Sequence, residues 1–144
     1  MKKVARKARI IALEICYQLD IENLMDEKDA LRVLKEKDID GEIYLKAEML
    51  VLGVVKNLTF IDELLSKYST NWDISRMSYV DRNILRIAVY EMLFAPDVPD
   101  VVVINEAIEI SKIYSGADSG KFINGLLDRI MKERICFPRG KITK

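Results

Sequence analysis

The 144-residue sequence contains no histidine, and this absence removes several kinds of chemistry at once. Histidine is the usual base for a serine or cysteine nucleophile, the commonest zinc ligand and the easiest proton shuttle near neutral pH. Pairs of carboxylates, such as Asp97 with Asp100 and Asp26 with Glu27, lie among loop and helix-surface signals and are typical of solvated faces. The composition therefore favours a protein that is not an enzyme and that carries no metal or cofactor.

Cysteine, proline and long apolar runs are also scarce. Cys16 and Cys136 are the only cysteines, and their wide separation fits neither a disulfide framework nor a metal-ligand spacing. No apolar run approaches the roughly 20 residues that a membrane span requires, and no signal peptide pattern opens the chain. Half of the residues are apolar, which suffices for one domain with a core. We therefore expect a single soluble, cytoplasmic domain with reduced thiols.

Charge is distributed unevenly along a chain that has 23 basic and 23 acidic residues. The first nine residues hold five basic side chains and no acidic one, and residues 129–144 hold six basic against one acidic. The middle of the chain is therefore acidic. If packing brings the two basic ends together, they form a positive surface suited to a phosphate backbone. The competing interpretation is a solvated N-terminal arm.

The sequence predicts a first helix that is amphipathic at its start. Helical spacing assigns a core face to Val4, Ala8, Ile11, Ala12, Ile15 and Leu19. The opposite side begins with basic residues and continues with apolar and aromatic ones, at Lys2, Arg6, Arg9, Ile10, Leu13 and Tyr17. Either other helices of this chain or a partner protein must cover the apolar part of that side.

Further helices are expected before residue 100. They span about 26–37, about 42–56, a segment opened by a Thr59–Asp62 capping box, and 79–94. Ser78 and Asp81 form a second capping-box pattern, before 79–94, and prolines end that helix. The clearest internal break is 69–75.

The run Val101 to Ile104 is the one place where β-branched residues favour a strand. A lone strand would have no partner in a chain otherwise free of strand patterns, so we interpret the run as the entrance to a helix. The sequence therefore predicts an all-α fold.

Residues 105–130 predict a helical hairpin with a polar elbow. Asn105 suits the cap of a first helix, Gly116 the left-handed position that ends it, and Ser119 the cap of a second helix. Lys121 and Phe122 fall off the apolar stripe of that second helix. A cationic arm together with an exposed aromatic side chain is a common way to hold single-stranded RNA.

The elbow also has a partial likeness to a phosphate-binding loop, which the spacing contradicts. Three residues separate Gly116 from Gly120 where the nucleotide motif requires four, and Phe122 replaces the Ser or Thr that should follow Lys121. The loop also follows a helix where the motif requires a strand. The spacing therefore argues against a nucleoside triphosphate site.

Motifs spread along the chain point to a known family. The first helix leads into Ala12-Leu13-x-x-x-Tyr17-Gln18-x-Asp20, and the central helix reads Asp81-Arg82-x-Ile84-Leu85-Arg86-x-Ala88-x-Tyr90-Glu91. The C-terminal half contains Val98-Pro99, Ile104-Asn105-Glu106-Ala107-Ile108-Glu109 and Ser119-x-Lys121-Phe122-Ile123-Asn124-Gly125-x-Leu127-Asp128. Over about residues 4–131, these motifs resemble the bacterial transcription antitermination factor NusB family.

The resemblance implies about seven helices in two packed sub-bundles that form one compact domain. This domain would cover residues 1–137, with the sub-bundles meeting near 69–78 and a basic tail at 138–144. It also implies a non-enzymatic RNA-binding adapter that recognises the boxA element of ribosomal RNA transcripts together with NusE, a small-subunit ribosomal protein. The pair would then join other Nus factors on RNA polymerase.

Site residues follow from the resemblance by position. The expected RNA-binding residues are Lys2, Lys3, Arg6, Lys7 and Arg9 in the N-terminal arm and Asp118, Lys121 and Phe122 at the elbow. The expected partner-binding residues are Tyr17, Arg76, Asp81 and Arg82. Two rival functions stay open, a protein–protein scaffold without specific RNA binding and the RNA-binding module of a ribosomal RNA methyltransferase. The sequence is equally compatible with a homodimer and with a heterodimer.

Overall fold

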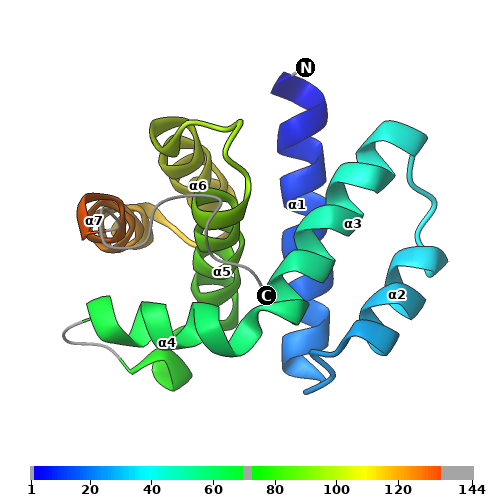
Figure 1. The fold of residues 1–144 in the computed structure, drawn as a ribbon, viewed down its shortest axis with the longest axis horizontal. Coiled ribbons are helices and arrows are strands. Elements are labelled where there is room, and N and C mark those ends of the chain that lie inside the picture. The colour runs from blue at the N-terminus through cyan, green and yellow to red at the C-terminus, as the bar shows by residue number, and fades with distance from the viewer. Residues whose placement is uncertain (1, 70–72, 134–144) are drawn as a thin grey trace.

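The computed structural model describes residues 2–69 and 73–133, except the side chains of Lys2 and Ala117. The expected tail at 138–144, Cys136 and the side chain of Lys2 therefore lie outside the described part. Seven α-helices and one short 3₁₀ helix make up that part (Figure 1): α1 Lys2–Ile21, α2 Glu27–Glu36, α3 Gly41–Lys56, α4 Leu58–Tyr68, η1 Ile74–Arg76, α5 Tyr79–Phe94, α6 Asp100–Tyr114 and α7 Ala117–Glu133. The all-α expectation is confirmed.

Local signals explain most of the helix boundaries. The Asp26 carboxylate accepts a hydrogen bond from the Asp29 backbone N–H and begins α2, and the Ser78 hydroxyl accepts one from the Asp81 N–H and begins α5. Such side-chain caps satisfy donors that a helix start leaves unpaired. Gly116, with φ +142°, separates α6 from α7. A positive φ of this kind suits glycine, as the sequence predicted.

Three expected helix starts are wrong. Because α6 begins at Asp100, directly after Pro99, Asn105 lies inside the helix and caps nothing. The start of α7 at Ala117 places Ser119 in its first turn. Helix α4 begins after Asn57, so Thr59 lies inside it. Asp62 accepts a hydrogen bond from Arg86 of α5 and forms no capping box with Thr59. The Val101–Ile104 run is helical, as we interpreted it.

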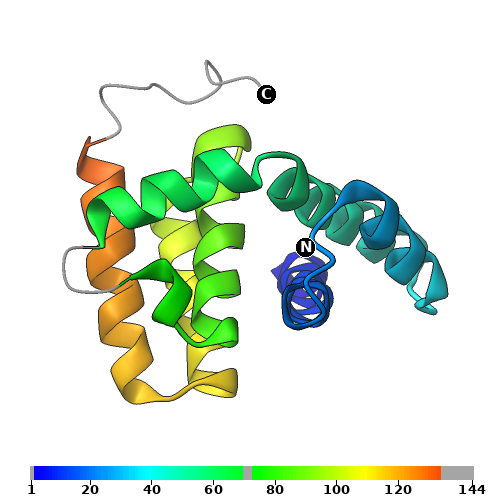
Figure 2. The same cartoon turned by 90° about the horizontal axis from the view of Figure 1, so that it is seen from below.

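The helices form two groups (Figures 1 and 2). In the first group α1, α2 and α3 pack together, and in the second α4, α6 and α7 surround α5. The groups are joined because α1 and α3 also pack against α5. The chain passes from one group to the other at Asn57, between α3 and α4, so the expected division at 69–78 falls inside the second group.

Helix α5 is the centre of the core. Nearly all of its residues from Asn83 to Leu93 are buried, because helices cover it on several sides. Tyr90 and Phe94 stack at 5.3 Å between ring centroids, and Phe60 of α4 meets Phe94 edge-on at 6.5 Å. The Tyr90 ring lies so close to Gly53 of α3 that a side chain at Gly53 would overlap it. Glycine at this position therefore permits the contact between α3 and α5.

No helix in the described ranges is long and apolar enough to cross a membrane.

The core face of α1 matches the expected spacing at Ala8, Ala12, Ile15 and Leu19, which are all buried. Arg9, Leu13 and Cys16 are buried as well, so the buried surface of α1 is broader than the helical wheel indicated. Burial raises the pKa of the Cys16 thiol to about 12 and leaves it protonated and inert at neutral pH.

Candidate nucleic-acid interface

The first turns of α1 present a small positive surface. Lys3 and Lys7 are exposed, and neither forms an ion pair with another residue of the described ranges. Arg6, between them in sequence, is different. Its Nε and Nη2 donate to the two carboxylate oxygens of Glu106 in α6, at 2.9 and 2.8 Å, while 44% of the Arg6 side chain stays exposed. The hydrogen bond and the charge of Glu106 raise the pKa of the Arg6 guanidinium.

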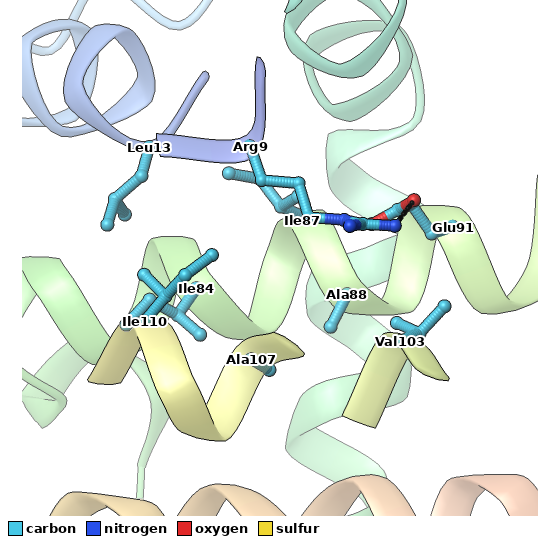
Figure 3. Close-up of a pocket in the computed structure, with 9 residues that line it drawn as sticks. All are labelled: Arg9, Leu13, Ile84, Ile87, Ala88, Glu91, Val103, Ala107 and Ile110. Atoms are coloured by element: carbon cyan, nitrogen blue, oxygen red, sulfur yellow. Dashed lines mark hydrogen bonds and ion pairs between the residues drawn. The ribbon is translucent and has the colours of Figure 1, made fainter. Parts of the chain in front are cut away.

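Arg9 is the clearest correction to the expected arm, because its side chain is only 9% exposed. Its Nε and Nη2 donate to the carboxylate of Glu91 in α5, at 2.7 and 2.9 Å. Figure 3 shows the two side chains meeting above the α5 helix. Burial lowers the pKa of the Arg9 guanidinium, but the hydrogen bonds and charge of Glu91 outweigh burial and the net pKa is raised. Arg9 is a structural ion pair in this conformation and does not face solvent.

The apolar residues that follow the arm are covered from within the molecule. Leu13 is 3% exposed and lies with Ile84 and Ile110 around a cavity of about 20 Å³ between α1, α5 and α6 (Figure 3). A cavity of this size holds at most one water molecule and is part of the core. Tyr17, one turn further along α1, is the exception at 39% exposed.

At the elbow, Lys121 and Phe122 line two different hollows. Lys121 is exposed and lines a hollow of about 530 Å³ between α6 and α7, together with Ile108, Lys112, Gly120 and Asn124. Phe122 is half-buried and lines a second hollow of about 180 Å³, together with Met77, Ser78, Asp81, Asp118 and Ser119. Lys121 and Phe122 therefore do not share the one surface that the sequence had predicted. Asp118 lines the hollow of Phe122 and not that of Lys121.

Asp81 is engaged inside the molecule. Its carboxylate accepts hydrogen bonds from the hydroxyls of Ser115 and Ser119, at 2.7 and 3.0 Å, and so ties the start of α5 to the elbow between α6 and α7. The expectation of a partner-binding Asp81 rested on its position in a motif. The structure assigns its carboxylate to holding the elbow.

Arg82 is also engaged. Its Nε and Nη2 lie 3.0 and 2.9 Å from the same oxygen of Asp20 in α1, and its Nη1 donates to the Ile74 carbonyl at 3.2 Å. The guanidinium additionally lies 4.9 Å from the ring centroid of Tyr79. Arg76 is exposed and forms no ion pair with the residues described here. Of the expected partner-binding residues, Tyr17 and Arg76 therefore remain accessible.

Tyr79 was not among the site residues predicted from the sequence. This residue is 43% exposed and packs edge-on against Tyr17, with ring centroids 6.3 Å apart. Ile21, one turn after Tyr17, is 47% exposed. We call these three residues the aromatic patch. The available signal was that Tyr79 does not belong to the apolar stripe that helical spacing gives to this helix, at Val80, Ile84, Ile87, Ala88 and Met92.

Helix α6 connects the arm to the elbow. Arg6 contacts Glu106 near the middle of α6, and Tyr114 at its end donates a hydrogen bond to Glu14 of α1 at 3.3 Å. At 1.5 Å rise per residue, Glu106 and Tyr114 are separated by about 12 Å along the helix. The hollow that Lys121 lines also includes Ile108, two residues after Glu106, so a short stretch of single-stranded nucleic acid can contact both the arm and Lys121. Within the described part of the chain, no cluster of acidic or cysteine side chains is placed to hold a metal ion.

Comparison with known proteins agrees with these motifs. A model of the NusB family matches residues 6–132. The chain belongs to the NusB family. The transcription antitermination protein NusB of Bdellovibrio bacteriovorus is 43% identical over 134 residues, which cover 92% of this chain and 98% of that protein. NusB of Pelotomaculum thermopropionicum is 43% identical over 128 residues, which cover 88% of each chain.

Solved NusB structures share the fold. The structure of Thermotoga maritima NusB has a TM-score of 0.81 and 40% identity, with 90% of this chain and 91% of that chain covered. A chain from a crystal structure of the antitermination factors NusB and NusE in complex with dsRNA has a TM-score of 0.79 and 30% identity, with 92% and 98% covered. The expected family and fold are confirmed.

One of the motifs that resemble those of the NusB family has a structural role here. Arg86 donates to Asp62 of α4 through two nitrogens, at 2.9 and 2.8 Å, and to Asp20 of α1 at 3.0 Å. Asn83 donates to the same Asp20 oxygen at 2.9 Å. We call Asp20, Asp62, Arg82, Asn83 and Arg86 the polar hub. It joins α1, α4 and α5 and explains why charged residues recur on the otherwise buried α5.

Proposed function

We propose that the protein is an RNA-binding transcription antitermination factor that recognises boxA-containing ribosomal RNA transcripts together with NusE. It acts in the cytoplasm, is not an enzyme, and joins other Nus factors on RNA polymerase. The single observation that carries this proposal is the surface formed by Lys3 and Lys7, two exposed lysines free of ion pairs in the described ranges, in a NusB-family chain. A related structure that contains NusB and NusE with dsRNA supports it.

In this proposal the RNA runs from the arm to the elbow. Lys3 and Lys7 attract phosphates without regard to sequence, and Lys121 provides a further exposed cation at the elbow. Phe122 lines a hollow in which a base can stack, a contact worth about 1–3 kcal/mol in other proteins. Lys2 extends the arm by one more charge. Asp118 repels phosphate, so its role at the same hollow would be to accept hydrogen bonds from a base.

The aromatic patch is the proposed NusE surface. Tyr17, Ile21 and Tyr79 are each between 39% and 47% exposed. Large aromatic side chains and arginines dominate the energy of many protein interfaces, and Arg76 is an exposed arginine three positions before Tyr79 in the sequence. Asp81 and Arg82 would act there indirectly, because they hold the elbow and the first turn of α5 in place.

Fluorescence anisotropy of labelled RNA tests this function. The titration compares a single-stranded boxA RNA, a scrambled strand of equal length and a duplex, each with and without equimolar NusE. We expect boxA RNA to bind more tightly when NusE is present, with an affinity that falls as salt rises because condensed ions are released from the phosphates. Equal weak binding of all three RNAs, unchanged by NusE, contradicts the proposal and favours a helical scaffold.

Charge reversal of the arm separates RNA binding from scaffolding. Lys3→Glu with Lys7→Glu should reduce RNA affinity at least tenfold at low salt and leave the melting temperature unchanged, because both side chains are exposed and unpaired. Lys35→Glu with Lys37→Glu, at the end of α2, is the matched control with the same charge change. An equal loss in the control variant would show that only the net charge matters.

A further inference from the structure

We propose that Glu106 occupies Arg6 in the free protein, so that an RNA phosphate must displace this carboxylate before Arg6 contributes to binding. This inference rests on the proposed RNA-binding function and adds to it a residue that sets the affinity. It assigns to Arg6 a different role from that of Lys3 and Lys7, although all three lie in the same turns of α1.

The first argument is the geometry of the Arg6–Glu106 pair. Two nitrogens of Arg6 donate to the two oxygens of Glu106 at 2.9 and 2.8 Å. This is the same two-bond arrangement that a guanidinium forms with a phosphate. The carboxylate thus takes the place of a phosphate. As long as it stays, the pair has no net charge and offers no attraction to an RNA backbone.

The second argument is that Arg6 is free to change partner. Its side chain is 44% exposed, so RNA can reach the guanidinium without rearranging the core. An ion pair that is accessible to water contributes little to folding stability. Loss of this ion pair therefore leaves α1 in place, held by the buried pair between Arg9 and Glu91 and by the core face of the helix.

The third argument is that Glu106 has a second cation beside it. The Glu106 side chain is 19% exposed, and its Oε1 lies 3.7 Å from Nη1 of Arg9. Nη1 takes no part in the two Arg9–Glu91 hydrogen bonds, which use Nε and Nη2. When Arg6 leaves for a phosphate, Glu106 keeps a positive neighbour. Burying its charge alone would be costly, and Arg9 removes that cost.

The test is RNA binding by Glu106→Gln, measured by anisotropy over a range of salt with single-stranded boxA RNA. Glutamine keeps the size of the side chain and removes its charge, so Arg6 becomes available to phosphate. We expect affinity to rise about two- to fivefold, the equivalent of a surface ion pair, and the slope of log K against log salt to steepen by about 0.7, one additional phosphate. Glu14→Gln is the control, because Glu14 is an exposed carboxylate of α1 that binds Tyr114 and, among the residues that the structure describes, no arginine.

A double-mutant cycle decides whether Glu106 acts through Arg6. The gain caused by Glu106→Gln should disappear when Arg6→Gln is also present. A loss of affinity in Glu106→Gln would overturn the inference, because it would mean that Glu106 orients Arg6 for RNA. An equal gain in both backgrounds, or in Glu14→Gln, would also overturn it, because only the overall field would then matter.

The outcomes also separate this inference from the proposed function. If the unaltered protein fails to bind any RNA with or without NusE, the function itself is contradicted. If the unaltered protein binds and Glu106→Gln changes nothing, only the role of Glu106 is wrong. Glu106→Asp provides a second variant in case the glutamine variant folds poorly. It keeps the charge but is too short to hold Arg6 through two bonds, and should give a smaller gain of the same sign.

Discussion

At the scale of single residues, Gly53 shows how one missing side chain sets the distance between two helices. A Cβ atom at this position would overlap the Tyr90 ring, which is stacked on Phe94 and cannot easily move away. Gly53→Ala should therefore lower the free energy of unfolding by about 1–3 kcal/mol, the usual cost of overpacking, although alanine favours a helix. Urea denaturation followed by circular dichroism measures this change.

Gly125 provides the matched control for that substitution. It lies inside α7, and nothing approaches within 4 Å of the position that a Cβ atom would take. Gly125→Ala should stabilise the protein by about 0.5–1 kcal/mol, because glycine is a poor helix former. If both variants shift stability in the same direction, the Gly53–Tyr90 contact does not limit the approach of α3 to α5.

Arg9 is the residue whose environment the sequence predicted least well. The helical wheel gave the correct phase for Ala8, Ala12, Ile15 and Leu19 but placed Arg9 in solvent. A wheel treats one helix alone and assumes that a charge avoids the core. Arg9 is buried because Glu91, which lies 82 positions away in sequence, provides its counter-charge. Only the packing of α5 against α1 makes that pair, and no local pattern encodes it.

At the scale of elements, the elbow between α6 and α7 depends on a contact from α5. Asp81→Ala removes the acceptor for the hydroxyls of Ser115 and Ser119. We expect faster hydrogen exchange in the first turn of α7 and a loss of about 1 kcal/mol of local stability, the net value of such hydrogen bonds. Hydrogen-exchange mass spectrometry over residues 115–125 measures the change.

Ser78→Ala distinguishes the elbow contact from a general weakening of α5. Ser78 caps α5 through the Asp81 backbone N–H and makes no hydrogen bond to Ser115 or Ser119 in the described structure. Its loss should cost about 1 kcal/mol of global stability, as cap substitutions do. Exchange in the first turn of α7 should stay as it was. Equal protection of that turn in both variants would mean that Asp81 does not hold the elbow.

Element boundaries were predictable where their signals are local. Asp26 and Ser78 cap their helices, and Gly116 adopts the positive φ expected of it. The starts of α6 and α7 were misplaced because Asn105 and Ser119 are good caps in isolation but lie inside longer helices. Pro99 was the stronger signal for α6, since proline is well tolerated at a helix start.

At the scale of the whole molecule, the polar hub connects the two groups of helices. Arg86 is 6% exposed and binds Asp20 of α1 and Asp62 of α4. Arg86→Met leaves both carboxylates without this cation, and we expect the free energy of unfolding to fall by about 3–5 kcal/mol. Urea denaturation monitored by circular dichroism provides the measurement. Asp20 keeps Arg82 and Asn83 as partners, which places the expected value toward the lower end.

Arg32→Met is the corresponding control at the surface. Arg32 pairs with Asp29 and lies near Glu36, all on α2, and its side chain is 46% exposed. Its loss should cost much less than the loss of Arg86, because water screens an exposed ion pair. If Arg86→Met cost no more than this, the hub would contribute nothing specific to the contact between the groups.

The arrangement of the helices could be predicted from the family motifs better than from the spacing of apolar residues. Apolar spacing predicted helices, but it could not predict which helices pack together, because many pairings bury similar stripes. The hub shows why: the contacts of Arg86 with Asp20 and Asp62 depend on how α1, α4 and α5 pack together, which no local pattern encodes. The sequence indicated a charged arm and an elbow as candidate interface residues, while the division of these residues into free and paired groups depended on the tertiary structure.

The continuity of α1 has a consequence for the strength of the proposed RNA binding. Lys3 and Lys7 belong to the same 20-residue helix as the deeply buried Ile15 and Leu19, so their backbone is already ordered before any ligand arrives. Basic segments that fold only on binding lose much of their interaction energy as conformational entropy. An arm built into a core helix avoids most of that loss. A few lysines on an ordered helix can therefore provide an affinity that a disordered tail would reach only with more basic residues.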